Sequence, residues 1–344
     1  MIVKNEEKVL ARCLESVRGV VDEIIIVDTG STDKTVAIAR KFTRKIYHFE
    51  WIDDFSAARN YAFSRATGDY FMWLDADDIL TAENAAKLVA LKENEIEKFD
   101  QIVMKYDLGG GFYSSRERIF RRATNPVWQD PIHEFITIQG KVLQIDACVT
   151  HMPPDKKAQS TRNIDIYEKN LARGMRLSPR GMYYYARELK EHGRIKEAVK
   201  YFTEFLDDGN GWVEDNIEAC AMLGVCFTAL DDRGAAFMAL QRSFTYDAPR
   251  AKVCCLIGYY YKEKGDFTMA VNWFMTALYL PARTELGFVV RDFCDYIPAI
   301  ELAVCYDKLG MWERAEYYNE IAGKAKPQSE QYLYNKNYFA KRQK

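Results

Sequence analysis

The chain has 344 residues, of which 48% are hydrophobic and 14% aromatic, so it is neither disordered nor fibrous and is long enough for two folded domains. Its 48 basic and 50 acidic residues give a formal net charge of −2. This balance, without any block of like charge, argues against nucleic acid or an anionic membrane as a partner.

The cysteines and the apolar runs indicate the compartment. None of the eight cysteines forms a C-x-x-C pair, so we interpret them as reduced core thiols rather than a disulfide framework or a zinc site. No apolar run approaches the roughly 20 residues that cross a bilayer, and the N-terminus has no signal-peptide core. We therefore expect a cytoplasmic protein with no transmembrane segment. The first strand is short at its start, which leaves open whether residues precede Met1.

Strand and helix patterns alternate in the first part of the chain. The expected strands are 1–3, 23–28, 45–49, 69–74 and 101–107, and the expected helices are 6–19, 32–42, 55–66 and 81–95. Such alternation predicts right-handed βαβ units and a mostly parallel sheet.

Two of these strands end in carboxylates. Asp28 closes the second strand and is followed by the turn Thr29–Asp33, while the fourth strand runs into Asp75-Ala76-Asp77-Asp78. The carboxyl ends of parallel strands face one crevice, so Asp28 and Asp75 are expected to meet there. Oxygen ligands suit Mg²⁺ or Mn²⁺ and, through the metal, a nucleotide diphosphate. The alternative for the acidic cluster is a turn that only begins helix 81–95.

The helix between these strands offers a cation. Asp54 or Ser56 is expected to cap its first turn, which leaves Arg59 one turn inside the helix and near the crevice. An arginine there could contact a nucleotide or phosphate by forked hydrogen bonds, or form a surface ion pair.

After Gly109-Gly110-Gly111 the pattern changes to short β-like pieces at 112–121, 134–138 and 141–150. The glycines lack the strand and helix context of a phosphate loop, so they predict a hairpin or hinge. The alternating Arg116, Arg118 and Arg121 would bind phosphate or an acidic acceptor, or would form one solvated face of a strand.

From Thr161 onward the sequence is helical, with an internal repeat. Turn glycines recur, each followed by small and aromatic residues of a second helix, at Gly193, Gly234, Gly265 and Gly310. The longer spacing after Gly265 predicts an insertion around 283–296. These features resemble tetratricopeptide repeats, whose concave face usually holds a peptide or another subunit. The alternative is an array that packs on the first domain and forms a homodimer.

Motifs in the first part of the chain carry a more specific resemblance. Their order and content are similar to glycosyltransferase family 2, and to its branch that includes the sublancin S-glycosyltransferase. The motifs are Ile2–Glu7, Val27–Asp33, Asp54–Asn60, Leu74–Asp78, Arg116–Arg122, Ile132–Glu134 and Thr150–His151.

The resemblance implies an α/β GT-A domain at 1–155, a connecting helix at 156–180 and all-α tetratricopeptide-like repeats at 181–344. It also implies an inverting transfer, dependent on Mg²⁺ or Mn²⁺, of a glucose- or N-acetylglucosamine-type sugar from a UDP-sugar. Carried over by position, the donor contacts are Asn5 and Glu7 in the base pocket, Asp28 at uracil or ribose, Arg59 as support and Asp75 at ribose and metal. Asp77 is then the main metal ligand and His151 a further one, although a lone histidine is also compatible with an ordinary surface residue.

Inversion requires a base that takes a proton from the acceptor. The candidates are Asp130, His133 and Glu134, and Glu134 is preferred because the His-Glu pair matches the motif. A thiol acceptor would need a weaker base.

The leading interpretation is a transferase acting on a peptide, protein or glycan acceptor selected partly by the repeats. The alternative is a repeat scaffold that binds or assembles partners and carries an inert transferase domain. The sugar stays open, because donor choice depends on the shape of the poorly patterned stretch 105–150.

Overall fold

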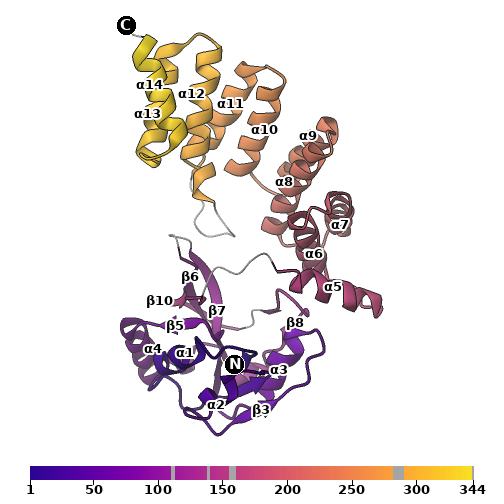
Figure 1. Cartoon of the computed structure of the whole chain (residues 1–344), viewed down its shortest axis with the longest axis vertical. Coiled ribbons are helices and arrows are strands. Elements are labelled where there is room, and N and C mark those ends of the chain that lie inside the picture. The colour runs from indigo at the N-terminus through magenta and orange to yellow at the C-terminus, as the bar shows by residue number, and fades with distance from the viewer. Residues whose placement is uncertain (110–112, 138–139, 155–159, 282–289, 343–344) are drawn as a thin grey trace. The chain divides into compact units, whose positions relative to one another are not determined.

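The computed structural model describes residues 1–109, 113–137, 140–154, 160–281 and 290–342. The chain divides into two compact units, Met1–Arg176 and Leu177–Lys344 (Figure 1). Gly110 and Gly111, and most of the insertion expected around 283–296, lie outside the described residues.

The first unit begins with a small parallel sheet, as the alternating pattern predicts. Its strands are β1 (Ile2–Val3), β2 (Ile26–Asp28) and β3 (Ile46–His48), in that order. Both pairings are parallel, so Asp28 and His48 emerge at the same edge.

A second sheet of five strands adjoins the acidic cluster, and it differs from the prediction. It contains β4 (Tyr70–Met72), β7 (Tyr113–Arg121), β6 (Gln101–Asp107), β10 (Val142–His151) and β5 (Asp78–Leu80), in that spatial order. Only β6 and β10 pair in parallel, and the other neighbours are antiparallel. The expectation of a mostly parallel sheet is therefore wrong for this half, because β7 returns directly beside β6 and the short β5 runs back along β10. A separate two-stranded ribbon joins β8 (Trp128–Gln129) to β9 (Phe135–Ile136).

Helices complete the first unit. They are α1 (Leu10–Ser16), α2 (Thr35–Ala39), α3 (Phe55–Arg65), α4 (Ala82–Asn94) and α5 (Arg162–Ala172), with the 3₁₀ turns η1 (Ile96–Lys98) and η2 (Arg122–Thr124). Leu88 and Leu91 of α4 belong to one buried cluster with Ile102, Met104 and Val149 of the second sheet. Burial of these side chains stabilises the sheet that carries the acidic turn.

The loop before α3 is tied to α5. Asp53 has a left-handed backbone (φ 61°), and its carbonyl accepts a hydrogen bond from Asn170 Nδ2 at 2.8 Å. Its carboxylate also accepts from Arg173 Nη2 at 3.1 Å. These bonds hold α5 in the first unit.

The second unit consists of helix pairs followed by one more helix (Figure 1). The pairs are α6 (Pro179–Glu191) with α7 (Ile195–Asp208), α8 (Val213–Ala229) with α9 (Arg233–Arg242), α10 (Ala251–Glu263) with α11 (Phe267–Tyr279), and α12 (Tyr296–Lys308) with α13 (Trp312–Ala325). The last helix is α14 (Glu330–Arg342), and the 3₁₀ turns are η3 (Ser243–Thr245) and η4 (Arg291–Phe293).

The turns inside the pairs follow the glycine pattern with one exception. Gly193, Gly265 and Gly310 have φ values of 75°, 77° and 71°, each two residues before the second helix of its pair. In the second pair this position is Asp231 (φ 59°), and Gly234 lies inside α9 instead of in the turn. Aspartate tolerates the left-handed conformation better than most residues, which explains why this repeat looks degenerate in sequence.

All eight cysteines are free thiols, as predicted, and six of them are buried. Among the described residues, no helix combines the length and the apolar character that crossing a bilayer requires.

Candidate active site

The end of β2 carries a group of polar residues that bind one another. Asp28 is buried, and its carboxylate accepts hydrogen bonds from the backbone N–H groups of Gly30 and Ser31, at 3.2 Å each. Its Oδ2 lies 3.9 Å from Nδ1 of His48 on the neighbouring strand. The Thr29–Asp33 turn is therefore shaped around the Asp28 side chain.

Asn5 and Glu7 close this turn from the other side. Asn5 has φ 56°, and its Oδ1 accepts a hydrogen bond from the Thr32 N–H at 2.8 Å. Glu7 Oε2 accepts from the Lys34 N–H at 3.0 Å. The structure thus places Asn5, Glu7 and Asp28 at one loop cluster.

The acidic turn after β4 forms a second group. Asp78 N–H donates to the Asp75 carbonyl at 3.1 Å, and Asp75 N–H donates to Asp78 Oδ2 at 3.0 Å, so the turn is closed at both ends. His151 lies opposite Asp78 in the β5–β10 pairing, and Met152 N–H donates to the Asp77 carbonyl at 2.8 Å. Strand pairing therefore brings His151 to the turn.

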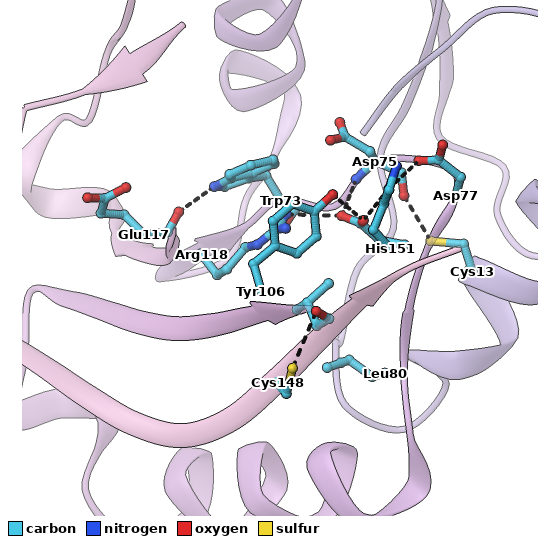
Figure 2. A network of polar contacts seen from close by, with 12 residues as sticks. Cys13, Trp73, Asp75, Asp77, Leu80, Tyr106, Glu117, Arg118, Cys148 and His151 are labelled. Carbon is cyan, nitrogen blue, oxygen red and sulfur yellow. Dashed lines mark hydrogen bonds and ion pairs between the residues drawn. The ribbon is translucent and has the colours of Figure 1, made fainter. Parts of the chain in front are cut away.

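Asp77, Asp78 and His151 form a compact set of three candidate metal ligands, whose ligand atoms lie within 4.8 Å of one another. His151 Nδ1 is 3.6 Å from Oδ1 of Asp77 and from Oδ1 of Asp78, and it has no hydrogen-bond partner although it is buried (Figure 2). Asp75, expected as a ligand, is outside this set. Asp78, which the sequence did not single out, is inside it.

Asp75 instead pairs with the arginine of α3. Arg59 Nη2 donates to Asp75 Oδ1 at 2.8 Å, and Arg59 Nε donates to Glu134 Oε1 at 2.6 Å. Its guanidinium carbon lies 4.8 Å and 4.9 Å from the ring centroids of Trp73 and Trp128. Arg59 is only 7% exposed, so these are buried ion pairs and not the surface ion pair considered from the sequence.

The loop that contains the three base candidates is fixed against the start of α3. Phe55 N–H donates to the Pro131 carbonyl at 2.9 Å, and the Ser56 hydroxyl donates to the Asp130 carbonyl. Asp130 and His133 both have left-handed backbones, with φ values of 64° and 54°. Aspartate and histidine adopt this conformation more readily than most residues other than glycine, so these positions shape tight turns in the loop.

Asp54 caps α3 by accepting a hydrogen bond from Ala57 N–H, as predicted, and this cap fixes the start of the helix that presents Arg59.

In the described part of the chain, the two groups of polar residues are not bonded to each other. Among the described residues, no hydrogen bond or ion pair joins Asp28, Asn5 or Glu7 to Asp75, Arg59 or Glu134.

Sequence reasoning missed a buried pair behind the acidic turn. Arg118 and Asp78 are both 0% exposed, and Arg118 Nη1 donates to Asp78 Oδ2 at 3.1 Å. The interpretation of Arg116, Arg118 and Arg121 as one solvated face is therefore wrong. Arg118 lies within the apolar end of β7, next to the buried Ile119 and Phe120.

Local charges shift the pKa values at the turn. Burial raises the pKa of Asp77, and the neighbouring Asp75 and Asp78 add to this, whereas His151 opposes it. Contact with Asp78 raises the pKa of His151 against the effect of burial. Burial alone would raise the pKa of Asp75, but Arg59, assisted by Arg118, holds it below the usual value. Asp77 is thus the carboxylate least compensated by the protein's own cations.

Two family models match parts of the chain. The model of the glycosyl transferase family 2 matches residues 1–152, and the tetratricopeptide repeat model matches residues 251–283. A TPR repeat-containing protein of Synechococcus elongatus is 30% identical over 317 residues, which cover 89% of this chain and 72% of that protein. The SPbeta prophage-derived glycosyltransferase SunS of Bacillus subtilis is 29% identical over 222 residues, which cover 60% of this chain and 52% of SunS.

Among solved structures, the crystal structure of MamA matches at a TM-score of 0.38 and 18% identity, covering 47% of this chain and 80% of that one. The family match over the first unit and the relative that spans most of the chain lead to one conclusion. The chain is a glycosyltransferase, in which residues 1–152 form a glycosyltransferase family 2 domain and an all-helical region with tetratricopeptide-like repeats follows.

Proposed function

We propose that the first unit transfers a glucose- or N-acetylglucosamine-type sugar from a UDP-sugar to a peptide, protein or glycan acceptor, with inversion and with the help of Mg²⁺ or Mn²⁺. One observation carries this proposal: Asp77 and His151 converge at the end of the acidic turn, in a domain of family 2.

The side chains at the turn fit a divalent cation. Neighbouring ligands around Mg²⁺ are about 3 Å apart, because each lies about 2.1 Å from the ion. Nδ1 of His151 and Oδ1 of Asp77 are 3.6 Å apart, and this nitrogen is buried without a hydrogen bond. Asp77 and His151 would hold the ion. A bound cation of this kind would neutralise the charge that develops on the departing diphosphate.

The nucleoside end of the donor is assigned to the loop cluster of Asn5, Glu7 and Asp28. Its hydrogen bonds fix the loop after β2, so this part of the proposed pocket would be formed before the donor binds. In the sequence, Asp75 lies between Asp28 and Asp77. Its side chain is 40% exposed, which leaves it able to contact the ribose.

Glu134 is the proposed base. One of its oxygens, Oε1, accepts from Arg59 Nε, whereas Oε2 accepts no hydrogen bond within the described part of the chain. In the reaction the acceptor atom bonds to C1 of the sugar as the bond from C1 to the diphosphate breaks. The acceptor proton passes to Glu134 Oε2, and UDP leaves. Asp130 and His133, in the same fixed loop, are the other candidates.

The second unit is proposed to select the acceptor. Stacked helix pairs of this type create extended binding surfaces. The SunS relative is named a glycosyltransferase, and the Synechococcus relative is named a TPR repeat-containing protein. This part of the proposal rests on the repeats alone.

Calorimetric titration of UDP, with and without Mn²⁺, tests the proposal, followed by a panel of UDP-sugars assayed for slow hydrolysis. We expect binding that requires the metal, and hydrolysis of one sugar. Absence of UDP binding under both conditions would reject the donor and favour a repeat scaffold with an inert transferase domain.

A further inference from the structure

The buried pair of Arg118 and Asp78 lies directly behind the proposed cation ligands. Arg118 comes from β7 and Asp78 from the first position of β5, and neither is exposed to solvent. Figure 2 shows the Arg118 side chain extending toward the acidic turn between Trp73 and Tyr106. Its guanidinium carbon is 4.0 Å from the centroid of the Trp73 ring and 4.4 Å from that of Tyr106.

Both oxygens of Asp78 are occupied by this arrangement. Oδ1 accepts from the Tyr106 hydroxyl at 2.9 Å. Oδ2 accepts from Arg118 Nη1 at 3.1 Å and from the Asp75 N–H at 3.0 Å. Asp78 therefore links β6 and β7 to the backbone of the turn, although its position in the set of three suggests a metal ligand.

The same contacts fix the positions of Asp77 and His151, the two residues proposed to hold the cation. Asp77 is the residue immediately before Asp78, and His151 faces Asp78 across the β5–β10 pairing. The His151 ring also lies against Tyr106, with centroids 5.9 Å apart. A change in Asp78 or Tyr106 would thus move both Asp77 and His151.

Stability alone is a poor explanation for this pair. A fully buried ion pair is often replaceable by apolar groups without loss of stability, because the cost of removing both charges from water offsets their attraction. Two donors of Arg118, Nε and Nη2, have no hydrogen-bond partner among the described residues, which makes the arrangement still less favourable for folding.

We propose that Arg118, Asp78 and Tyr106 are positioning residues that fix the Asp77 carboxylate and the His151 imidazole for a divalent cation. This inference rests on the proposed metal-dependent function. Hydrogen-bonded groups behind metal ligands typically change metal affinity by about 10- to 100-fold when they are removed.

The experiment titrates Mn²⁺ into the full chain with saturating UDP, by calorimetry, and records thermal unfolding of each protein. The main variant combines Arg118→Met with Asp78→Asn, which removes both charges and keeps similar shapes. Arg118→Lys and Tyr106→Phe are the milder variants. Arg121→Met is the matched control, because Arg121 lies on the same strand and pairs with Asp100 at 3.1 Å, in a partly exposed position.

We expect the double variant to unfold cooperatively and to bind Mn²⁺ about 10- to 100-fold more weakly than the wild type. Tyr106→Phe should weaken Mn²⁺ binding less than the double variant does. Arg118→Lys should retain part of the wild-type affinity, and Arg121→Met should match the wild type. A folded double variant with wild-type Mn²⁺ affinity overturns the inference. If the double variant does not fold, unchanged affinity in both milder variants overturns it. A wild type that binds UDP equally well without metal overturns the metal-dependent function, and this inference with it.

Discussion

Replacement of Arg59 by methionine tests how the site is held together. Arg59→Met keeps most of the side-chain stem but removes the cation that joins Asp75 to Glu134. Burial alone would lower the pKa of Arg59, but the two carboxylates raise it above its ordinary value, so the charged form is the one that the fold requires. The variant leaves two carboxylates without their cation.

The magnitude follows from the exposure of each group. Removing one partner of a buried ion pair costs about 3–5 kcal/mol. The Asp75 side chain is 40% exposed and can be hydrated again, whereas that of Glu134 is 14% exposed and cannot. Loss of the stacking on Trp73 and Trp128 adds about 1 kcal/mol. Because Asp75 is hydrated again, the cost of breaking the pair falls to about 2–3 kcal/mol, and with the stacking contribution we expect a total loss of about 3–4 kcal/mol.

Thermal unfolding and hydrogen exchange measure this loss. A change of this size lowers the Tm of a unit of this length by roughly 6–16 °C. Exchange should increase in peptides covering α3 and the loop Asp130–Glu134, and stay unchanged in α6 to α14. The matched control is Arg65→Met on the same helix, since Arg65 also stacks on aromatic rings, Tyr47 and Tyr61, but is exposed. An Arg59→Met protein as stable as Arg65→Met would refute the reasoning.

The pH dependence of the same variant has a defined sign. Arg59 holds the pKa of Asp75 below its usual value in the folded state. A carboxylate of this kind contributes stability above its unfolded pKa, near 4, and loses it as the pH falls through the folded pKa. The difference in Tm between wild type and Arg59→Met should therefore narrow below about pH 4. A difference that widens on acidification would contradict the assigned pairing.

Three further changes separate metal binding, proton transfer and repeat packing. Asp77→Asn should abolish metal-dependent UDP binding in calorimetry without lowering Tm; metal-dependent binding at wild-type strength would remove Asp77 as a ligand. Glu134→Gln should lower the turnover of a UDP-sugar with acceptor by about 10²- to 10⁴-fold while UDP still binds, and unchanged turnover would exclude it as the base. Gly323→Ala should destabilise the second unit by about 1–3 kcal/mol in urea unfolding, because its Cβ would lie 2.3 Å from the buried Tyr332 ring. Gly234→Ala, with no atom nearer than 3.7 Å, is the control that should leave stability unchanged or raised.

Local signals predicted the elements that present the site. The Asp54 cap and the start of α3 follow from side-chain chemistry within one helical turn, and β6 covers the expected residues 101–107. The repeat turns are equally local. Each contains a residue with a left-handed backbone, two positions before the second helix of its pair. The family motifs then supplied the assignment of Asp77 and His151, which strand pairing brings to one turn.

Contacts between distant segments could not be predicted in this way. Arg118 and Asp78 are 40 positions apart, and no local pattern distinguishes a buried arginine from the half-exposed Arg116 on the same strand. Arg59 and Glu134 are 75 positions apart. The antiparallel pairing of β5 with β10 depends on three residues, Asp78–Leu80, for which the sequence predicted no strand. In each case the deciding interaction is tertiary.

The distribution of charge at the turn supports the proposal that a cation acts on Asp77 and not on a neighbouring acid. Arg59 pairs with Asp75 and Glu134, and Arg118 pairs with Asp78. Asp77 lies among these acids with no lysine or arginine within ion-pair distance in the described residues; its neighbour there is His151, at 3.6 Å. Burial and the adjacent carboxylates raise the pKa of Asp77, so further positive charge would stabilise its ionised form. The protein's own arginines compensate every acid at the turn except this one, and a divalent cation bound together with a diphosphate would supply the missing charge.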